Sequence, residues 1–250
     1  MTNDIKKVNK VSAVQNALEN LRKYIKDNNI KNLPSEDEIS QSLGVSRSTL
    51  REAIVILEKE GVVSRIQGKG TLVNTFITKL ENRIDTGNNI ETVLKRQGYD
   101  VRFEVLSADY RIASKYEKIE MGINDRDEIL VVEKLLYANN EPVALYVERI
   151  AKKHLKTFDL KEGYFSSDIF KTIDKITGLK ISHDVIKIKA LVCDKKQSKL
   201  FNAEKSIPLM SFDILEYDRR GLIVMYNTQY YTCDFVDFTI CRNIAYTAWE

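Results

Sequence analysis

The sequence predicts an α+β protein of two domains: a small helical domain that ends in a hairpin, and a larger domain of antiparallel strands with short helices. Three observations support this class. The chain has 250 residues, more than the roughly 100–200 of one usual domain. Apolar residues recur with a helical period over about the first 60 residues. Short β-prone runs separated by polar turns dominate beyond about residue 100.

The composition is that of an ordinary globular protein, with 43% hydrophobic and 30% charged residues. No apolar run approaches the roughly 18 residues that a membrane span needs, and the lysine-rich N-terminus lacks the apolar stretch of a secretory signal. We therefore expect a soluble protein of the cytoplasm without a membrane partner. The three cysteines are odd in number and match no zinc or redox spacing, which indicates reduced thiols and no disulfide framework.

The small excess of positive charge lies entirely near the N-terminus. Residues 1–76 hold 12 of the 39 basic and 9 of the 36 acidic residues, so the remainder is balanced at 27 of each. A basic N-terminal domain is typical of a nucleic-acid-binding protein, although a bias of this size also arises by chance.

Three helices are predicted in the first domain. The first spans about 11–25, where apolar residues recur at steps of three and four. The second follows Ser35, which begins a capping box, and runs to about Leu43. The third has Ser46 as a good N-cap and extends to about Glu60.

A hairpin, or wing, follows the third helix. The β-prone runs 62–66 and 71–73 flank a glycine-rich turn at 67–70. A polar stretch comes next and predicts a linker. The expected boundaries are a first domain over 1–75, a linker over 76–89 and a second domain over 90–250.

Two stretches of the second domain resemble each other. In 128–146 and in 207–226, two apolar runs flank a polar turn, as in a β-hairpin. Each stretch follows a short helical segment, at 114–121 and at 195–202. This repetition predicts two related halves around one antiparallel sheet, unless the two hairpins are alike by chance.

The third helix has one packing face and one free face. At about 100° per residue, apolar residues cluster on one arc and polar residues cover much of the other. Arg47 and Arg51 lie one turn apart, as in a recognition helix that reads the major groove, where arginine donates bidentately to guanine. The alternative is a solvated amphipathic helix whose arginines pair with Glu36, Glu52 or Glu58.

The wing favours DNA over that alternative. Lys69 stands at the tip of the loop between two glycines, which let the backbone approach another chain closely. Arg65 adds a second positive charge at the base of the hairpin. A cation on a tip of this kind predicts contact with a phosphate backbone.

These motifs resemble the DNA-binding domain of the GntR family of bacterial regulators. The stretches that carry the resemblance are LPSE at 33–36, LGVSRSTLREA at 43–53, LEKEG at 57–61 and QGKGT at 67–71. The resemblance implies a winged helix-turn-helix on double-stranded DNA, with contacts from Ser35, Ser46, Arg47, Ser48, Thr49, Arg51, Gly68 and Lys69. Many members have an arginine early in the second helix where this chain has Asp37, so we expect one contact to be missing and the operator preference to differ.

The second domain resembles the ligand-binding UTRA domain of the HutC subfamily, which shares the fold of chorismate lyase. The residues that carry this resemblance are EPVA at 141–144, SSDIF at 166–170 and YYTCDFVDF at 230–238. It implies a small-molecule effector in a cleft. The positions that correspond to this cleft are Tyr146, Glu148, Arg149, Ser166, Ser167, Asp168, Tyr226, Tyr230 and Asp234.

The expected cleft differs from that of relatives that bind sugar phosphates. Those relatives carry arginines near the final Asp, where this chain has Thr232, Phe235 and Asp237, and Asp168 stands where a phosphate-binding serine is expected. Carboxylates repel a phosphate at close range, so our hypothesis is a neutral or cationic effector rather than a simple phosphosugar. The alternative is that Asp168 caps its helix and Asp237 faces solvent.

The sequence predicts a transcriptional regulator rather than an enzyme. It has no nucleophile elbow, phosphate loop or dinucleotide fingerprint, and His154 and His183 follow no metal-ligand spacing, so no catalytic residue, metal or cofactor is expected. The expected assembly is a homodimer on a palindromic operator, with an affinity that the effector controls, usually as a repressor in this family. The alternatives are a small-molecule enzyme, which the chorismate lyase fold suggests, and a structural or nucleoid-associated DNA binder.

Overall fold

The computed structural model describes residues 10–87, 89–156, 165 and 169–242. The chain divides into two compact units. Met1–Asn88 together with Phe238–Glu250 form the first, called the head below, and Asn89–Asp237 form the second, called the sensor unit.

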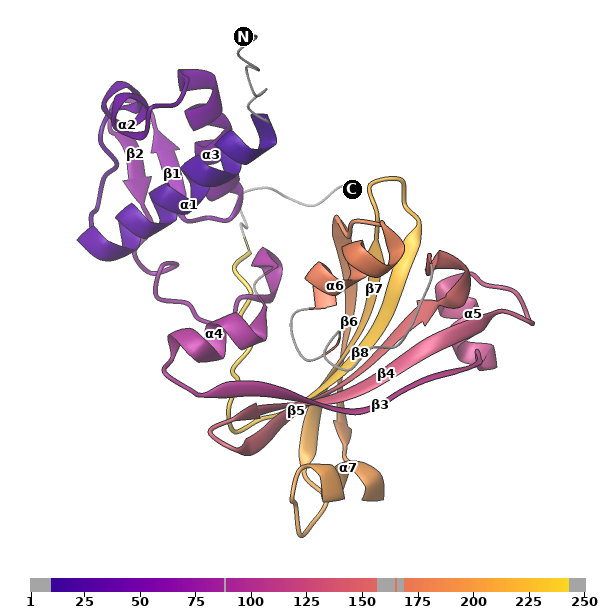
Figure 1. Ribbon diagram of the computed structural model, residues 1–250. Coiled ribbons are helices and arrows are strands. Elements are labelled where there is room, and N and C mark those ends of the chain that lie inside the picture. The colour runs from indigo at the N-terminus through magenta and orange to yellow at the C-terminus, as the bar shows by residue number, and fades with distance from the viewer. Residues whose placement is uncertain (1–9, 88, 157–164, 166–168, 243–250) are drawn as a thin grey trace, which may run out of the picture. The chain divides into compact units, whose positions relative to one another are not determined.

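The head contains the predicted helices and hairpin (Figure 1). They are α1 (Lys10–Asn28), α2 (Glu36–Leu43), α3 (Arg47–Lys59), β1 (Val63–Ile66) and β2 (Gly70–Val73). Leu21, Leu50 and Leu57 are among the residues of α1 and α3 that are buried together in one apolar core. The predicted elements are confirmed, with α1 extending three residues beyond the predicted end because polar Lys26 to Asn28 continue the helix.

Local side-chain bonds fix the turn between α2 and α3. Ser35 and Glu38 form the predicted capping box, and the resulting hydrogen bonds lower the pKa of the Glu38 carboxyl. Gly44 ends α2 in the left-handed conformation, with φ of 62°, which glycine adopts without strain. Ser46 then caps α3 by accepting a hydrogen bond from the Thr49 backbone N–H.

The sensor unit is one six-stranded antiparallel sheet with helices on both faces. The strand order is β3-β4-β5-β8-β7-β6. The strands are β3 (Val101–Ile112), β4 (Glu128–Ala138), β5 (Glu141–Ala151), β6 (His183–Val192), β7 (Pro208–Tyr217) and β8 (Ile223–Thr232). The helices are α4 (Ile90–Arg96), α5 (Lys115–Met121), α6 (Ile169–Thr177) and α7 (Lys195–Leu200), and single 3₁₀ turns lie at Ile84–Thr86 in the head and Lys152–His154 in the sensor unit.

The order of elements repeats within the sensor unit. A strand, a short helix and a hairpin occur first as β3, α5, β4 and β5, and again as β6, α7, β7 and β8. The two halves meet where β5 pairs with β8 in the middle of the sheet. Both predicted hairpins and both predicted helical segments are therefore confirmed, and the repeat agrees with two related halves.

The two faces of the sheet pack against different helices. Leu130, Val132 and Ile150 share a buried cluster with α6, and their face is called the α6 face below. Ile129 and Val131, which alternate with them along β4, pack on the opposite face with α5. Farther along that opposite face, a third apolar cluster includes residues of α7, so the face is called the α5/α7 face.

The segment predicted as a linker contains ordered pairing within the head. The Thr239 N–H donates to the Asn82 carbonyl and the Ile84 N–H donates to the Thr239 carbonyl, each at 3.1 Å. Buried Arg83 donates two hydrogen bonds to Asp85. The chain thus passes between the units twice, once on leaving the head and once on returning to it after β8.

Candidate functional site

The first turn of α3 is built around three hydroxyl groups. The Ser46 Oγ atom lies 2.9 Å from Ser48 Oγ and 2.8 Å from Thr49 Oγ1. Ser46 and Ser48 are exposed, whereas Thr49 is only 7% exposed. Burial favours a role for the Thr49 side chain in the helix cap over a direct contact with DNA.

Arg47 and Arg51 both project from the head and pair with acids of α2. Arg47 Nε lies 2.8 Å from Asp37 Oδ1, and Arg51 Nε donates to Glu36 Oε2 at 2.6 Å. The side chains of Arg47 and Arg51 remain 65% and 63% exposed. The hydrogen bond that Arg51 donates to Glu36 raises the pKa of Arg51. The pairing of Arg51 with Glu36 was one of the alternatives left by the sequence, whereas the pairing of Arg47 with Asp37 was not expected.

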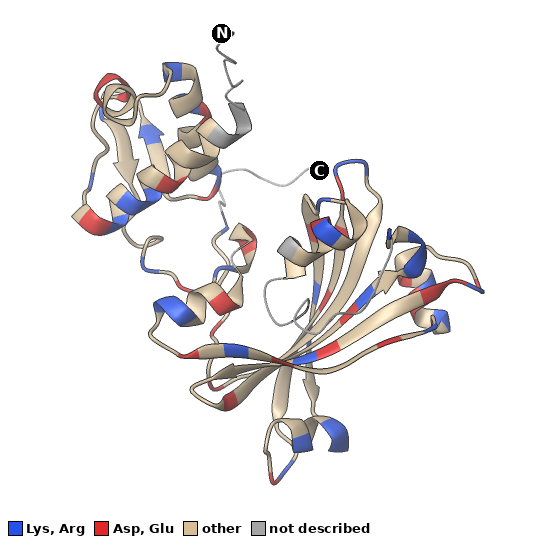
Figure 2. Cartoon of the chain, viewed as in Figure 1, with Lys and Arg blue, Asp and Glu red and all other residues tan. Residues whose placement is uncertain are grey.

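The wing presents its basic tip to solvent. Gly68 and Gly70 have positive φ values of 77° and 80°, and Lys69 between them is exposed. The Lys69 N–H donates to the Ile66 carbonyl, which closes the loop. The predicted contacts Ser35, Gly68 and Lys69 are therefore all exposed. In the head, acidic and basic residues lie close together, so charge alone does not mark the interface (Figure 2).

The predicted effector residues of β5 and β8 are divided between the two faces of the sheet. Glu148 is opposite Val132 and Asn227 in the strand register, so it lies on the α6 face with Tyr146. Arg149 is opposite Tyr226, and these two lie on the α5/α7 face with Tyr230. Successive residues of a strand point to opposite faces, so two of these five positions lie on the α6 face and three on the α5/α7 face.

The other predicted effector positions are Asp234 and the three residues 166–168. Asp234 is exposed in the turn after β8. Ser166, Ser167 and Asp168 lie outside the described residues. Phe165, just before them, is buried in the apolar cluster that includes α6.

A row of buried polar groups crosses the α6 face, and most of these groups were not predicted from the sequence. Lys134 and Glu148 form an ion pair of 2.8 Å, with residue exposures of 1% and 0%. On β8, Asn227 is 1% exposed, and its Oδ1 atom has no hydrogen-bond partner among the described residues. Unpaired buried polar atoms are rare in folded proteins and need an explanation, of which a bound ligand is one. The alternation of residues along β4 and β8 could have identified Lys134 and Asn227.

Aromatic rings stand next to this row. The Tyr146 and Tyr231 hydroxyls lie 3.0 Å apart, and Tyr231 also bonds Gln229 at 2.5 Å. The rings of Phe103 and Tyr146 pack edge to face with centroids 5.5 Å apart. Burial raises the pKa of both tyrosines, so their hydroxyls remain neutral hydrogen-bonding groups. We call Lys134, Tyr146, Glu148, Asn227, Gln229 and Tyr231 the polar floor.

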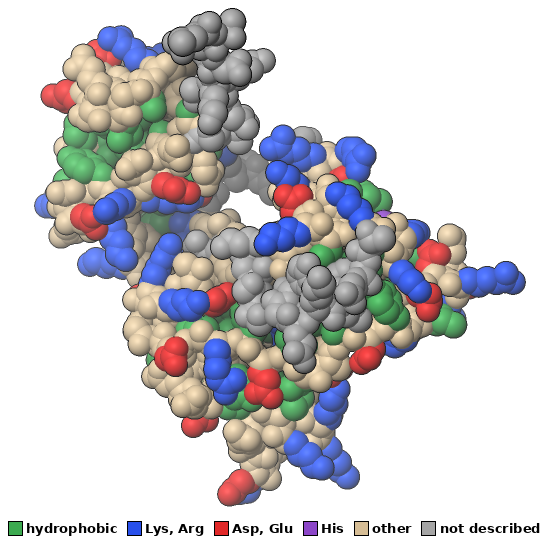
Figure 3. Space-filling view, in the orientation of Figure 1, with side chains coloured by type: hydrophobic (Ala, Val, Ile, Leu, Met, Phe, Trp, Pro, Cys, Tyr) green, Lys and Arg blue, Asp and Glu red, His purple; other side chains and the backbone are tan. Residues whose placement is uncertain are grey.

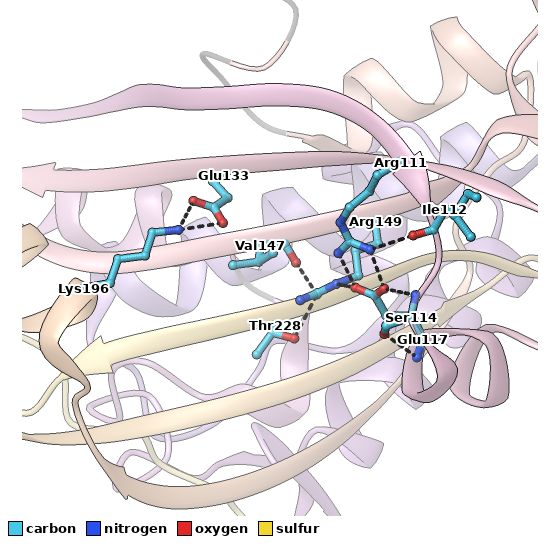
Figure 4. Close-up of polar contacts among 9 residues, drawn as sticks. All are labelled: Arg111, Ile112, Ser114, Glu117, Glu133, Val147, Arg149, Lys196 and Thr228. Carbon is cyan, nitrogen blue, oxygen red and sulfur yellow. Dashed lines mark hydrogen bonds and ion pairs between the residues drawn. The ribbon is translucent and has the colours of Figure 1, made fainter.

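The α5/α7 face holds a different network, centred on Glu117 (Figure 4). Arg111 donates to both carboxylate oxygens of Glu117, at 2.6 and 2.7 Å, and Arg149 donates to one of them at 2.6 Å. Burial alone would raise the pKa of Glu117, but the hydrogen bonds from Arg111, Ser114 and Arg149 outweigh it and hold the pKa well below its usual range. Arg149 also bonds Thr228.

Two other predicted positions belong to the same face. The Tyr226 hydroxyl donates to Asp213 at 3.2 Å, and Lys189 pairs with the same carboxylate at 2.6 Å. Burial raises the pKa of Tyr226 and of half-buried Tyr230. Arg149 and Tyr226 thus belong to side-chain networks that join strands and α5, and Tyr230 packs against the apolar cluster of Leu145 and Leu209, which favours a structural role for all three.

His154 and His183 belong to no cluster of metal-ligating side chains among the described residues. No group of histidine, cysteine and acidic residues that could hold a metal ion occurs within the part of the chain that the structure describes. Burial lowers the pKa of His154, while His183 is exposed beside Ser182.

None of the described helices is long and apolar enough to cross a membrane. On the face shown in Figure 3, basic and acidic side chains are interspersed.

Comparison with known proteins agrees with this architecture. Residues 13–73 match the bacterial regulatory proteins of the gntR family, and residues 96–237 match the UTRA domain. The HTH-type transcriptional repressor NagR of Bacillus subtilis is 23% identical over 223 residues, which cover 87% of this chain and 89% of that protein. A probable repressor of the fructoselysine utilization operon of Escherichia coli is 25% identical, with 75% of each chain covered.

Solved structures show the same fold. The possible transcriptional regulator YydK of Bacillus subtilis superposes with a TM-score of 0.76 at 19% identity, covering 92% of this chain and 99% of that one. PhnF from Mycobacterium smegmatis gives a TM-score of 0.58 at 20% identity, covering 91% and 99%. The chain therefore belongs to the GntR family of bacterial regulators, in the winged-helix and UTRA arrangement of the HutC subfamily, and is a DNA-binding transcriptional regulator controlled by an effector rather than an enzyme.

Proposed function

We propose that this regulator acts in the cytoplasm as a homodimer that places two α3 helices in successive major grooves of a palindromic operator. The observation that carries this proposal is the exposure of Arg47 and Arg51 on the first turns of α3. Two half-sites read by one dimer lie about one helical turn, roughly 34 Å, apart. The proposed division is a DNA-binding domain at 1–75, a linker at 76–89 and a dimerising effector domain at 90–250.

In this proposal the residues of the head have different roles. Arg47 and Arg51 read base edges, because exposed guanidinium groups can donate bidentately to guanine. Ser48, with Lys69 and Gly68 of the wing, contacts phosphates. Ser35 and Ser46 present exposed helix caps to the DNA backbone, and Thr49 supports the cap of α3.

Arg47→Ala and Lys69→Ala are each expected to weaken operator binding without unfolding the head, because both side chains are exposed. Arg47→Ala should cost about 1–3 kcal/mol of discrimination at one base pair, and Lys69→Ala should lower the slope of log K against log salt by about one. Fluorescence anisotropy over a salt series measures both. Lys26→Ala removes the same charge from the last turn of α1 and is the control. Unchanged affinity in both test variants would refute the assigned interface.

For the effector we propose a site on the α6 face, with the polar floor as its base. The floor combines hydroxyl, amide and carboxylate groups with aromatic rings, a set that suits a polyhydroxylated, sugar-derived molecule. Lys134 is paired with Glu148 and so contributes little net charge. This pairing supports the hypothesis of a neutral or cationic effector. Relatives named for fructoselysine utilization and for mannosyl-D-glycerate metabolism fit a sugar-derived class.

The route from this site to the head runs along β8. Asn227, Gln229 and Tyr231 all lie on this strand. The chain continues from β8 to Thr239, which is hydrogen-bonded to Glu81, Asn82 and Ile84 in the head. A ligand that moves β8 therefore pulls on a segment already bonded to the head, and the resulting change in the two heads alters operator affinity.

Asn227→Ala and Gln229→Ala are expected to abolish the thermal stabilisation by effector while leaving the fold intact. A thermal-shift screen would use free sugars, their 6-phosphates, amino sugars, amino acids and nucleosides. A true effector at one hundred times its Kd stabilises the protein by about 2.7 kcal/mol. Tyr230→Phe, on the opposite face of β8, is the matched control and should respond as the wild type does. A shift that survives both test variants would place the site elsewhere, and a shift given only by sugar phosphates would contradict the neutral or cationic class.

A further inference from the structure

The two arginines of α3 both form ion pairs with acids in the first turn of α2. In both ion pairs the carboxylate contacts Nε, in Arg47 through Asp37 and in Arg51 through Glu36. A guanidinium carries one N–H on Nε and four on its two terminal nitrogens. A carboxylate beside Nε therefore favours one direction of the side chain and leaves the four terminal N–H groups for a further partner.

The capped first turn of α2 fixes the backbone position of Asp37. It lies between Glu36 and Glu38 in the first turn of α2, and the reciprocal bonds of Ser35 and Glu38 fix that turn. The Ser35 N–H donates to Glu38 at 2.9 Å, and the Glu38 N–H donates to Ser35 Oγ at 3.3 Å. The Asp37 carboxylate is thus attached to a rigid element, as a group that positions another should be.

Asp37 has two opposing effects on DNA binding. A carboxylate beside the DNA repels phosphates, which weakens binding to every sequence. The same carboxylate restricts the rotamers of Arg47, a long side chain that loses much entropy when it is ordered on a base. The pair is exposed and therefore weak in the free protein, but it strengthens where DNA excludes water.

We propose that Asp37 is a positioning residue that raises the discrimination of this regulator for its operator by orienting Arg47. The proposal rests on the proposed role of α3 as the recognition helix. It predicts that Asp37 lowers affinity for all DNA and raises the ratio of specific to nonspecific affinity. A purely repulsive role would lower both affinities by the same factor and leave the ratio unchanged.

The test compares two duplexes: one selected by the wild-type protein from a random-sequence library, and a scrambled duplex of the same composition. Asp37→Ala is expected to bind the scrambled duplex more tightly, and its ratio of affinities should fall by about tenfold, within the range of one bidentate base contact. Asp37→Asn should keep most of the ratio, because an amide oxygen at this position can accept a hydrogen bond from Arg47 Nε. Glu19→Ala removes an exposed acid of α1 and should leave the ratio unchanged.

A double-mutant cycle separates this proposal from the general role of α3. In an Arg47→Ala background, Asp37→Ala should no longer change the ratio, since Asp37 acts through that side chain. The proposal is overturned if Asp37→Ala changes both affinities equally, or if its effect persists without Arg47. A different result would refute the proposed role of α3 as the recognition helix: Arg47→Ala alone would leave binding to the selected duplex unchanged. Thermal midpoints of all variants confirm that the head is folded.

Discussion

Lys134→Met is expected to destabilise the sensor unit by about 3–5 kcal/mol, the usual cost of leaving one member of a buried ion pair without its partner. Glu148 is fully buried and lies 2.8 Å from the Lys134 ammonium, so the substitution leaves a carboxylate without its cation in a low-dielectric interior. Methionine has nearly the length of lysine, which keeps the loss of packing small. Calorimetry should show the transition of the sensor unit lowered by about 10 °C.

The double variant Lys134→Met with Glu148→Leu is the control for this result. Replacing a whole buried ion pair by apolar residues of similar volume is usually neutral or stabilising by about 1–4 kcal/mol. We therefore expect most of the lost stability to return. A double variant as unstable as Lys134→Met would show that the damage arises from packing, and the electrostatic explanation would be wrong.

The expected stability of that double variant bears on why the ion pair exists. If an apolar pair serves the fold equally well, stability does not account for a lysine and a glutamate in the middle of the α6 face. Asn227, with its unpartnered buried oxygen, lies beside Glu148 in the register. Polar groups that cost stability and lie side by side are typical of a binding site, which is why we place the effector there.

The elements of the head could be predicted because their signals are local. The Ser35 capping box, the Ser46 cap and the glycines of the wing each act over a few residues, and each has the predicted conformation in the structure. The pairing of Arg47 with Asp37 was not predictable in this way, because it depends on the angle at which α2 meets α3. The sequence alone offers several acids within reach of that arginine.

The effector site could be predicted less well, because strand register decides it. Glu148 and Arg149 are neighbours in the sequence, yet they lie on opposite faces of β5 and belong to different networks. The resemblance to a family indicated which strands matter but gave no rule for the face. The hairpins could be found from local turns, whereas the pairing of β5 with β8, which brings Asn227 beside Glu148, joins segments about 80 residues apart.

Glu117→Gln is the second large effect we expect, a loss of about 3 kcal/mol in the stability of the sensor unit at neutral pH. Glu117 is buried, bonds both Arg111 and Arg149, and caps α5 through Ser114. Glutamine retains the shape and the cap but removes the charge between two cations. Glu120 lies on the same helix as Glu117 and pairs with half-exposed Lys187 of β6. Glu120→Gln breaks this exposed pair and should cost much less stability than Glu117→Gln.

The pH dependence gives an independent test of the same carboxylate. Because the folded-state pKa of Glu117 lies below its ordinary value of 4.5, the stabilisation is complete above that value and is lost as the pH falls below it. The wild type should therefore lose stability steadily from about pH 5 downwards, and the Glu117→Gln curve should be flatter over that window. Equal slopes for the two proteins would show that Glu117 titrates alike in the folded and unfolded states, and the network in Figure 4 would then contribute no charge-dependent stability.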